Sequence, residues 1–228
     1  MVEVGAGLGS LTVALAAAAS EVVAVEADRS LVPALREAVA GLPVRVVEGD
    51  ALRLDWTDEL PGRPWRMVSN LPYNVAVPLV FRMLEEAPQV VEYLVMVQRE
   101  VGERLVAGPG APAYGAASAR LAYLADATTV RRVPASVFWP APKVESVLVR
   151  LVPREPPVAT PRDGLFRVIE AGFAQRRKTM RNALVRLGLS ADLAAAALAG
   201  CGLDASVRAE QLGLTEFACL AEAVAANG

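Results

Sequence analysis

The sequence predicts an α/β fold, in which a mostly parallel sheet carries helices on both faces and a small all-helical domain follows. Three observations predict it. Short apolar runs rich in valine alternate with helix-length segments in the first half of the chain, and each run ends in glycine or a polar residue. After a cluster of prolines, the remaining segments have only helical patterns. A length of 228 residues suits one large domain with a smaller one.

Five runs predict the strands of the sheet. They are Val2–Val4, Val22–Val25, Val44–Val47, Met67–Ser69 and Tyr93–Val97. An amphipathic helix is expected between two of them, at Ser30–Ala40. Ser136–Val152 predicts two further strand pieces, interrupted by Pro140 and Pro142, which would close the sheet edge as an antiparallel hairpin.

Four prolines between positions 153 and 161 indicate a linker. We therefore expect a first domain over residues 1–155 and a helical domain over residues 162–228. Its helices are predicted at Asp163–Leu187, Ser190–Ala199 and Thr215–Ala226. Ser190 and Thr215 are the expected N-caps, because a hydroxyl can accept from the free amides of a first helical turn.

The composition excludes several classes of chemistry. The chain has no histidine, which excludes a histidine general base, a Ser-His-Asp triad and a His-ligated metal site. The two cysteines cannot form a four-thiolate site, and we expect them to be reduced, buried residues. The apolar stretch Leu11–Ala19 is too short to span a membrane. We expect a cytoplasmic protein that is a monomer and has no metal and no membrane partner.

The formal charge of −2 conceals a local excess of positive charge. Residues 162–186 contain seven basic residues and two acidic ones. Arg177, Lys178 and Arg181 are the expected phosphate contacts, on one side of a single helix. A solvated helix face is the alternative interpretation of this segment.

Gly5, Glu26, Asp50 and Asn70 follow four different predicted strands. Ligands of open α/β sheets bind at the carboxyl ends of the strands, so we expect these residues to meet. Glu26 is placed to accept ribose hydroxyls, and Asp50 to bond an adenine amino group or nearby backbone. Ser10 stands where a dinucleotide-binding loop has its third glycine, so the pattern favours S-adenosylmethionine over a dinucleotide.

The segment Asn70-Leu71-Pro72-Tyr73 indicates the chemistry. An exocyclic amine of a nucleobase is a poor nucleophile, because its lone pair is delocalised into the ring. The amide oxygen of Asn70 and the carbonyl of Leu71 can accept its two hydrogens and align the nitrogen. Pro72 would stiffen the turn, and Tyr73 offers a face on which the base can stack.

The chain resembles the ribosomal RNA adenine dimethyltransferases of the small subunit along nearly its whole length. The resemblance rests on Val2–Gly7, Val25-Glu26, Gly49-Asp50, Asn70–Tyr73, Gln98–Val101, Arg104–Ala107, Tyr114-Gly115, Val133–Ser146 and Phe173–Leu184. It implies a Rossmann-like class I methyltransferase sheet, with Gly5, Gly7, Glu26, Asp50 and Asn70 binding S-adenosylmethionine. It also implies that Asn70, Leu71, Pro72 and Tyr73 hold the target base, with Phe138 covering its other side. A core aromatic is the alternative for Phe138.

The implied substrate is a pair of adjacent adenines in a hairpin loop near the 3′ end of 16S rRNA, within a pre-30S particle. Each adenine would receive two methyl groups during ribosome biogenesis. Two alternatives remain open: an antibiotic-resistance methylase acting on large-subunit rRNA, and a ribosome-assembly factor without catalysis.

The sequence departs from the family in one respect. Members carry a segment before the first strand, with a Phe-Leu motif that folds over the cofactor, whereas Met1 here lies directly on that strand. We therefore expect this chain to bind S-adenosylmethionine more weakly than a form that carries the segment.

Overall fold

The computed structural model describes residues 1–72, 75–175 and 177–227, which form two compact units. The α/β unit consists of Met1–Gly102 and Ala125–Pro153. The helical unit consists of Glu103–Leu124 and the chain from Arg154 onward. Glu103–Leu124 thus differs from the predicted division, which placed it in the first domain. The reason is burial, because Tyr114, Ala119 and Tyr123 belong to the core of the helical unit.

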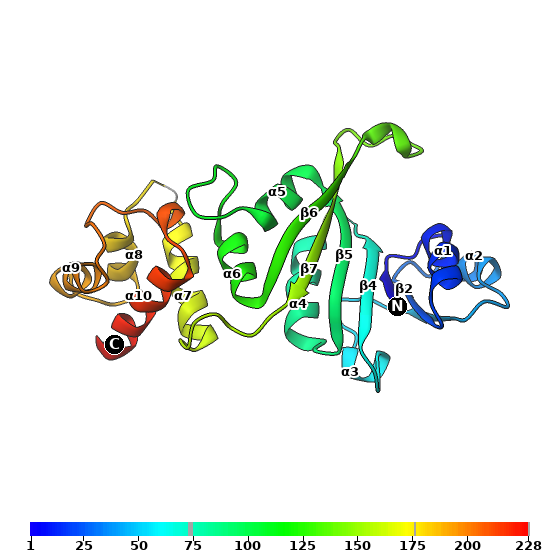
Figure 1. Cartoon of the computed structure of the whole chain (residues 1–228), viewed down its shortest axis with the longest axis horizontal. Helices are drawn as coiled ribbons and strands as arrows, with labels where there is room; N and C mark the ends of the chain where they lie inside the picture. The colour runs from blue at the N-terminus through cyan, green and yellow to red at the C-terminus, as the bar shows by residue number, and fades with distance from the viewer. Residues whose placement is uncertain (73–74, 176, 228) are drawn as a thin grey trace. The chain divides into compact units, whose positions relative to one another are not determined.

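In the described residues, seven strands form one sheet in the order β3-β2-β1-β4-β5-β7-β6 (Figure 1). They are β1 (Val2–Val4), β2 (Val22–Glu26), β3 (Val44–Glu48), β4 (Trp65–Asn70), β5 (Val90–Gln98), β6 (Ala125–Val133) and β7 (Ser146–Pro153). The first five are parallel, and β7 pairs antiparallel with both β5 and β6. The five strands predicted in the first half of the chain and the Rossmann-like fold class are confirmed.

The closing hairpin exists, but its first strand was predicted wrongly. It is β6, and residues 134–145 form the connection, with a 3₁₀ turn at Ala135–Val137. Three prolines in that connection cannot donate to a strand ladder, which excludes it from the sheet. β6 lies at the sheet edge and most of its residues are exposed, so it has no alternating apolar pattern.

Helices cover both faces of the parallel part of the sheet. They are α1 (Ser10–Ala18), α2 (Val32–Ala38), α3 (Trp56–Glu59), α4 (Ala76–Glu86) and α5 (Arg99–Val106), which begins in this unit. On one face, α1 and α2 bury Val22 and Ala24 of β2. On the other face, the hydroxyl of Tyr93 donates to the Met83 carbonyl of α4 at 3.0 Å. A Cβ at Gly102 would overlap Val147 of β7, so glycine lets α5 approach the sheet closely.

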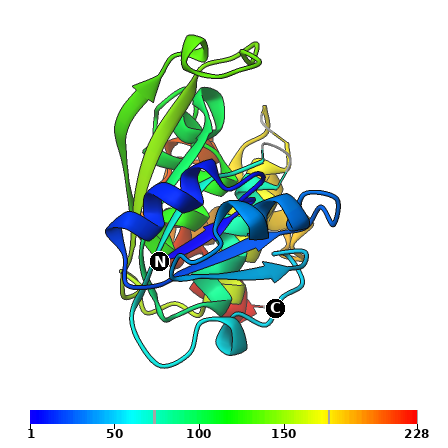
Figure 2. The same cartoon turned by 90° about the vertical axis from the view of Figure 1, so that its right-hand side faces the viewer.

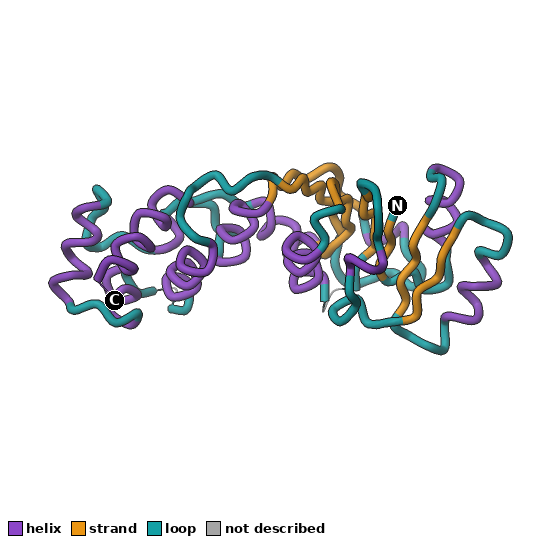
Figure 3. Tube along the Cα trace, turned by 90° about the horizontal axis from the view of Figure 1, so that it is seen from below, coloured by secondary structure: helices purple, strands orange, loops and turns teal. Residues whose placement is uncertain are grey.

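The helical unit, which carries the C-terminus in Figure 3, consists of helices and the loops between them. Its helices are α6 (Ala116–Leu124), α7 (Arg162–Phe173), α8 (Met180–Arg186), α9 (Ala191–Gly200) and α10 (Leu214–Asn227), with a 3₁₀ turn at Ala209–Gln211. Their core is aromatic and aliphatic, and the rings of Phe173 and Tyr114 meet edge to face at 5.6 Å. The Tyr114 hydroxyl donates to the Leu212 carbonyl at 2.8 Å, which ties the segment before α6 to the C-terminal part.

The predicted helix over Asp163–Leu187 is two helices. The chain leaves α7 after Phe173 because Met180 enters the core, where its amide donates to the Val207 carbonyl at 2.8 Å. The N-cap at Ser190 is confirmed, since its hydroxyl accepts from the Leu193 amide. Thr215 is not an N-cap, because α10 already begins at Leu214.

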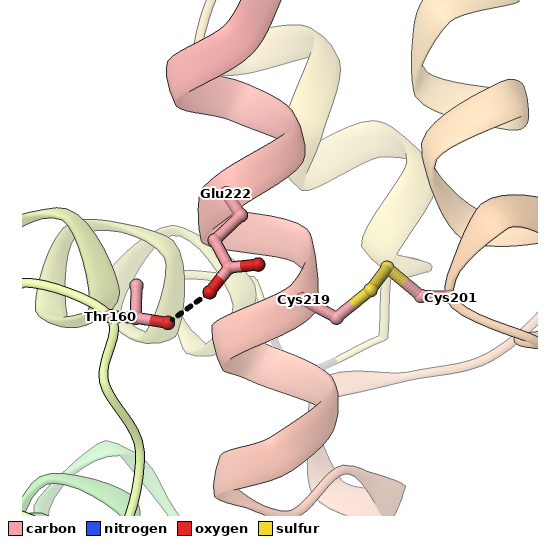
Figure 4. The surroundings of a disulfide bond; sticks show 4 residues. All are labelled: Thr160, Cys201, Cys219 and Glu222. Carbon is pink, nitrogen blue, oxygen red and sulfur yellow. Dashed lines mark hydrogen bonds between the residues drawn. A yellow bond between two sulfur atoms is a disulfide. The ribbon is translucent and has the colours of Figure 1, made fainter.

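The prediction of two reduced cysteines is also wrong. Cys201 and Cys219 form a disulfide whose Cα atoms are 5.9 Å apart, and it joins the end of α9 to α10 (Figure 4). One turn further along α10, Glu222 accepts from the hydroxyl of Thr160 at 2.8 Å. Separation along the chain, which is all the sequence shows, does not reveal that the two helices bring these thiols together. In the part of the chain that the structure describes, no helix is both long and apolar enough to cross a bilayer.

Candidate active site

The candidate site lies where β1 and β4 separate at the carboxyl edge of the sheet. The strand order reverses between these strands, which is the place where open α/β sheets bind ligands. Val2 lies opposite Met67 in the ladder. Two residues later, the amide of Val4 donates to the side-chain hydroxyl of Ser69 at 2.9 Å. A side chain thus satisfies the buried amide while the two backbones diverge.

The loop after β1 depends on glycine. Gly5, Gly7 and Gly9 have φ angles of 76°, 56° and 87°, which L-residues with a Cβ rarely adopt. A Cβ at Gly5 would lie 3.2 Å from Cδ of Pro72. The amide of Gly5 donates to the Val25 carbonyl at 2.9 Å, so β2 fixes the start of the loop.

Glu26 ends β2 with its carboxylate held by backbone amides. One oxygen accepts from the Gly7 amide at 2.7 Å and the other from the Asp28 amide at 2.8 Å. Each oxygen keeps a second lone pair for a ligand hydroxyl. Asp50 follows β3, is exposed, and accepts from the Leu52 amide at 2.9 Å through one carboxylate oxygen.

Two cavities open at this edge. The strand-end cavity, of about 230 Å³, is lined by Val4, Gly5, Val25, Glu26, Ala27, Gly49, Asp50, Ala51, Leu52, Pro72, Val75 and Leu79. The Asn70 cavity, of about 300 Å³, is lined by Asn70, Leu71, Pro72, Phe138, Trp139, Pro140 and Pro142. Pro72 lines both, so one residue separates a pocket with carboxylates from a pocket with amide and carbonyl oxygens.

Most of the predicted site residues therefore come together in the α/β unit. Gly5, Glu26 and Asp50 line the strand-end cavity, whereas Gly7 acts through its bond to Glu26. Asn70 lines the other cavity. Leu71, Pro72 and Phe138 line that cavity too. Tyr73 lies outside the described residues.

The predicted RNA contacts lie in the helical unit and are not all on one helix. Lys178 precedes α8, with its amide bonded to the Gln175 carbonyl at 2.9 Å, and Arg177 lies in the same turn. Arg181 is in α8 and donates to the Ala191 carbonyl at 3.3 Å. Arg186 donates to the side chain of Gln175 at 2.8 Å, so part of the positive charge holds the helical unit together.

A buried carboxyl lies below the glycine loop. Glu3 of β1 is 2% exposed and accepts from the Thr12 hydroxyl at 2.6 Å. The pKa of Glu3 is raised to about 7, mainly by burial and to a smaller extent by the charge of Glu26, while the hydrogen bond from Thr12 acts in the opposite direction. The carboxyl therefore keeps its proton to a higher pH than an exposed glutamate does.

Sequence reasoning missed Trp139, Pro140 and Pro142 as lining residues of the Asn70 cavity. The prolines were interpreted as strand breakers only. Trp139 was missed because an apolar residue in a strand-like run is expected to be buried, and its exposure cannot be recognised from the sequence.

Comparison with known proteins identifies the family. Residues 1–225 match the family model for ribosomal RNA adenine dimethylase. Two relatives, each named ribosomal RNA small subunit methyltransferase A, are 48% identical. The one from Thermobifida fusca is matched over 97% of this chain and 79% of its own length. For the one from Streptomyces griseus the shares are 97% and 78%.

Two solved structures share the fold at 25% identity. A dimethyladenosine transferase from Plasmodium falciparum has a TM-score of 0.80, with 96% of this chain and 87% of the other covered. The 23S rRNA methyltransferase ErmE has a TM-score of 0.73, with 98% and 90% covered. With a family model matching nearly every residue and relatives at 48% identity, this chain belongs to the ribosomal RNA adenine dimethylase family.

Proposed function

We propose that this protein transfers methyl groups from S-adenosylmethionine to N6 of two adjacent adenines in a hairpin loop near the 3′ end of small-subunit rRNA. The products would be N6,N6-dimethyladenines. The observation that carries the proposal is the pair of cavities with Pro72 as their common wall. One presents the carboxylates that a nucleoside needs, and the other presents the acceptors that an amine needs.

The strand-end cavity fits the adenosine part of S-adenosylmethionine. The carboxylate of Glu26 is pre-positioned by two amides to accept ribose hydroxyls, and Asp50 lies at the next strand end. Gly5 lets the backbone approach the ligand without a side chain in the way. When bound, the cofactor supplies an electrophilic methyl group on a sulfonium.

The Asn70 cavity fits the target base. The side-chain oxygen of Asn70 and the backbone carbonyl of Leu71 would accept the two amino hydrogens, which aligns the nitrogen lone pair and stabilises the charge that develops on it. Phe138 lines the same cavity and can cover the base. Tyr73 is proposed as the second stacking residue on the basis of sequence alone. This alignment chemistry requires no histidine.

The small subunit is the preferred substrate because both 48% identical relatives carry that name. We propose that the protein binds the RNA as a monomer within a pre-30S particle, in the cytoplasm. Arg177, Lys178 and Arg181 would contact phosphates from the helical unit. The structural similarity to ErmE supports one second candidate, methylation of large-subunit rRNA.

The test is transfer of labelled methyl groups to purified small and large subunits that lack the modification, followed by mapping of the methylated positions. We expect transfer to the small subunit and its loss in Asn70→Ala. Asn227→Ala, at the end of α10, is the matched control and should retain activity. No transfer by the wild type, or full activity in Asn70→Ala, would refute the proposal. Methylation of the large subunit alone would establish the second candidate.

Calorimetric titration with S-adenosylmethionine separates binding from transfer. Because Asn70 lines the second cavity, Asn70→Ala should retain most of the cofactor affinity, whereas Glu26→Ala should lose it. A large loss of affinity in Asn70→Ala would show that Asn70 also holds the cofactor.

A further inference from the structure

The connection between β6 and β7 forms an unusual surface. We call residues 130–144 the hairpin tip. It projects beyond the neighbouring strands of the α/β unit in both Figure 1 and Figure 2. Arg131, Arg132 and Lys143 lie in it, and it contains no acidic residue. Within the described part of the chain these three cations pair with no carboxylate, whereas Arg150 of β7 pairs with Glu92.

The most exposed large side chain of the hairpin tip is Trp139. It is 98% exposed, yet it lines the Asn70 cavity together with Phe138. Val137, two residues earlier, is 62% exposed. A tryptophan that its own chain leaves uncovered at the mouth of a binding cavity is typical of a contact surface.

The sheet register places one of the cations on the same face as Asn70. Asn70 pairs with Met96, Met96 with Leu148, and Leu148 with Arg131. Residues paired across strands point to the same face, so Arg131 lies on the Asn70 side, about 14 Å away across three strand spacings. Arg132 follows directly and lies on the opposite face.

We propose that the hairpin tip binds the unpaired nucleotides next to the target adenine. Trp139 stacks on the base adjacent to the one in the Asn70 cavity, and Arg131 and Lys143 contact phosphates. The inference rests on the proposed function and defines a second base subsite for it. With two adjacent adenines as substrate, one adenine lies in the Asn70 cavity while its neighbour stacks on the indole of Trp139.

Charge and chemistry favour single-stranded RNA as the occupant. Aromatic side chains bind successive bases through their faces, and nearby cations track the backbone. In the described residues the three cations pair with no carboxylate, so their charge can complement phosphates, and Trp139 makes the hairpin tip continuous with the cavity that would hold the base. A partner protein with an apolar surface is the alternative outcome, and it would not depend on a base at this position.

Binding can be measured without turnover, since tryptophan fluorescence reports on Trp139. Trp56 and Trp65 are 1% and 3% exposed, so a base can reach only Trp139 among the three tryptophans of the chain. The probe is a short single-stranded RNA with two adjacent adenines, titrated into the full chain. We expect the RNA to quench the fluorescence of Trp139. A matched oligonucleotide with an abasic site in place of the neighbouring adenine should quench it much less.

The variants then test each contact. Trp139→Ala should weaken RNA binding and raise KM for the RNA about tenfold, with S-adenosylmethionine affinity unchanged, and Trp139→Phe should restore most of the loss. Arg131→Ala should reduce the dependence of log affinity on log salt by about one, whereas Arg132→Ala should change it less. Leu42→Ala, at another exposed apolar residue, is the control for general surface effects.

The outcomes separate the two proposals. If the wild type methylates RNA and Trp139→Ala has an unchanged KM and RNA affinity, the hairpin-tip inference is wrong and the proposed function stands. If the wild type binds the oligonucleotide through Trp139 but transfers no methyl group, the proposed function fails and the contact remains. No quenching by any RNA that serves as substrate would also overturn the inference.

Discussion

The buried carboxyl of Glu3 makes the stability of the α/β unit depend on pH. Burial raises the pKa of Glu3 from its ordinary 4.5 to about 7 in the fold. Between these values the folded state binds more protons than the unfolded state, so stability falls as pH rises. The contribution is fully present below pH 4.5 and is lost above pH 7. At about 1.4 kcal/mol for each tenfold change in proton affinity, the loss is roughly 3 kcal/mol.

Glu3→Gln isolates this effect, because glutamine stays neutral and can still accept from Thr12. Urea unfolding followed by tryptophan fluorescence is the assay, since Trp56 and Trp65 are buried in the α/β unit. The variant and the wild type should be similarly stable near pH 4.5. At about pH 8 the variant should be more stable by roughly 3 kcal/mol.

Two controls make the comparison specific. Glu37→Gln removes the same charge from an exposed position of α2 and should change the pH dependence little. Thr12→Ala removes the hydrogen bond that lowers the pKa of Glu3. In this variant, which keeps Glu3, the free energy of unfolding should therefore fall more steeply with pH above pH 7 than it does in the wild type. A difference between wild type and Glu3→Gln that is constant from pH 4.5 to about 8 would refute the reasoning.

Three further substitutions test the packing. Gly102→Ala should destabilise the α/β unit by about 1–3 kcal/mol in urea unfolding, because its Cβ would overlap Val147. Ser69→Ala leaves the buried amide at the end of β1 without its partner and should cost about 1–3 kcal/mol and weaken S-adenosylmethionine binding. Cys201→Ser removes the disulfide to Cys219. This disulfide joins two residues that are 18 positions apart in the sequence. The substitution should reduce hydrogen-exchange protection in α9 and α10 by the equivalent of about 3 kcal/mol.

Each of these has a matched control. Gly108→Ala should be nearly neutral, because a Cβ there would meet nothing within 4 Å. Ser10→Ala changes an exposed serine and should leave cofactor binding intact. Reductant should lower protection in the wild type but not in Cys201→Ser. Equal responses of variant and control in any of the three comparisons would contradict the contact invoked.

The parallel strands and their polar ends could be predicted because burial on both faces leaves a local signature. Val22–Val25 is continuously apolar, and Glu26 follows it directly. The edge strand Ala125–Val133 left no such signature, since one side of it faces solvent and its cations and threonines obscure the pattern. Periodicity identifies a strand through what the strand buries.

The site could be predicted as far as it depends on residues at strand ends. Glu26 and Asn70 needed only the parallel topology to be placed at one edge. Trp139 could not be placed, because its exposure results from the path of a proline-rich connection. The disulfide was missed for a related reason, because the meeting of Cys201 with Cys219 depends on how α9 and α10 pack.

Pro72 as a wall of both cavities has a thermodynamic consequence. A base that shifts this residue on entering one cavity also changes the shape of the other. Coupling of that kind is reciprocal, so a cofactor that tightens RNA binding must itself be held more tightly by the enzyme–RNA complex, by the same factor. The same coupling would act after each of the four successive methyl transfers. If the coupling through Pro72 is strong, dissociation of the demethylated cofactor weakens binding of the partly methylated base, and the two dissociate together. If the coupling is weak, the cofactor can be exchanged while the base stays bound.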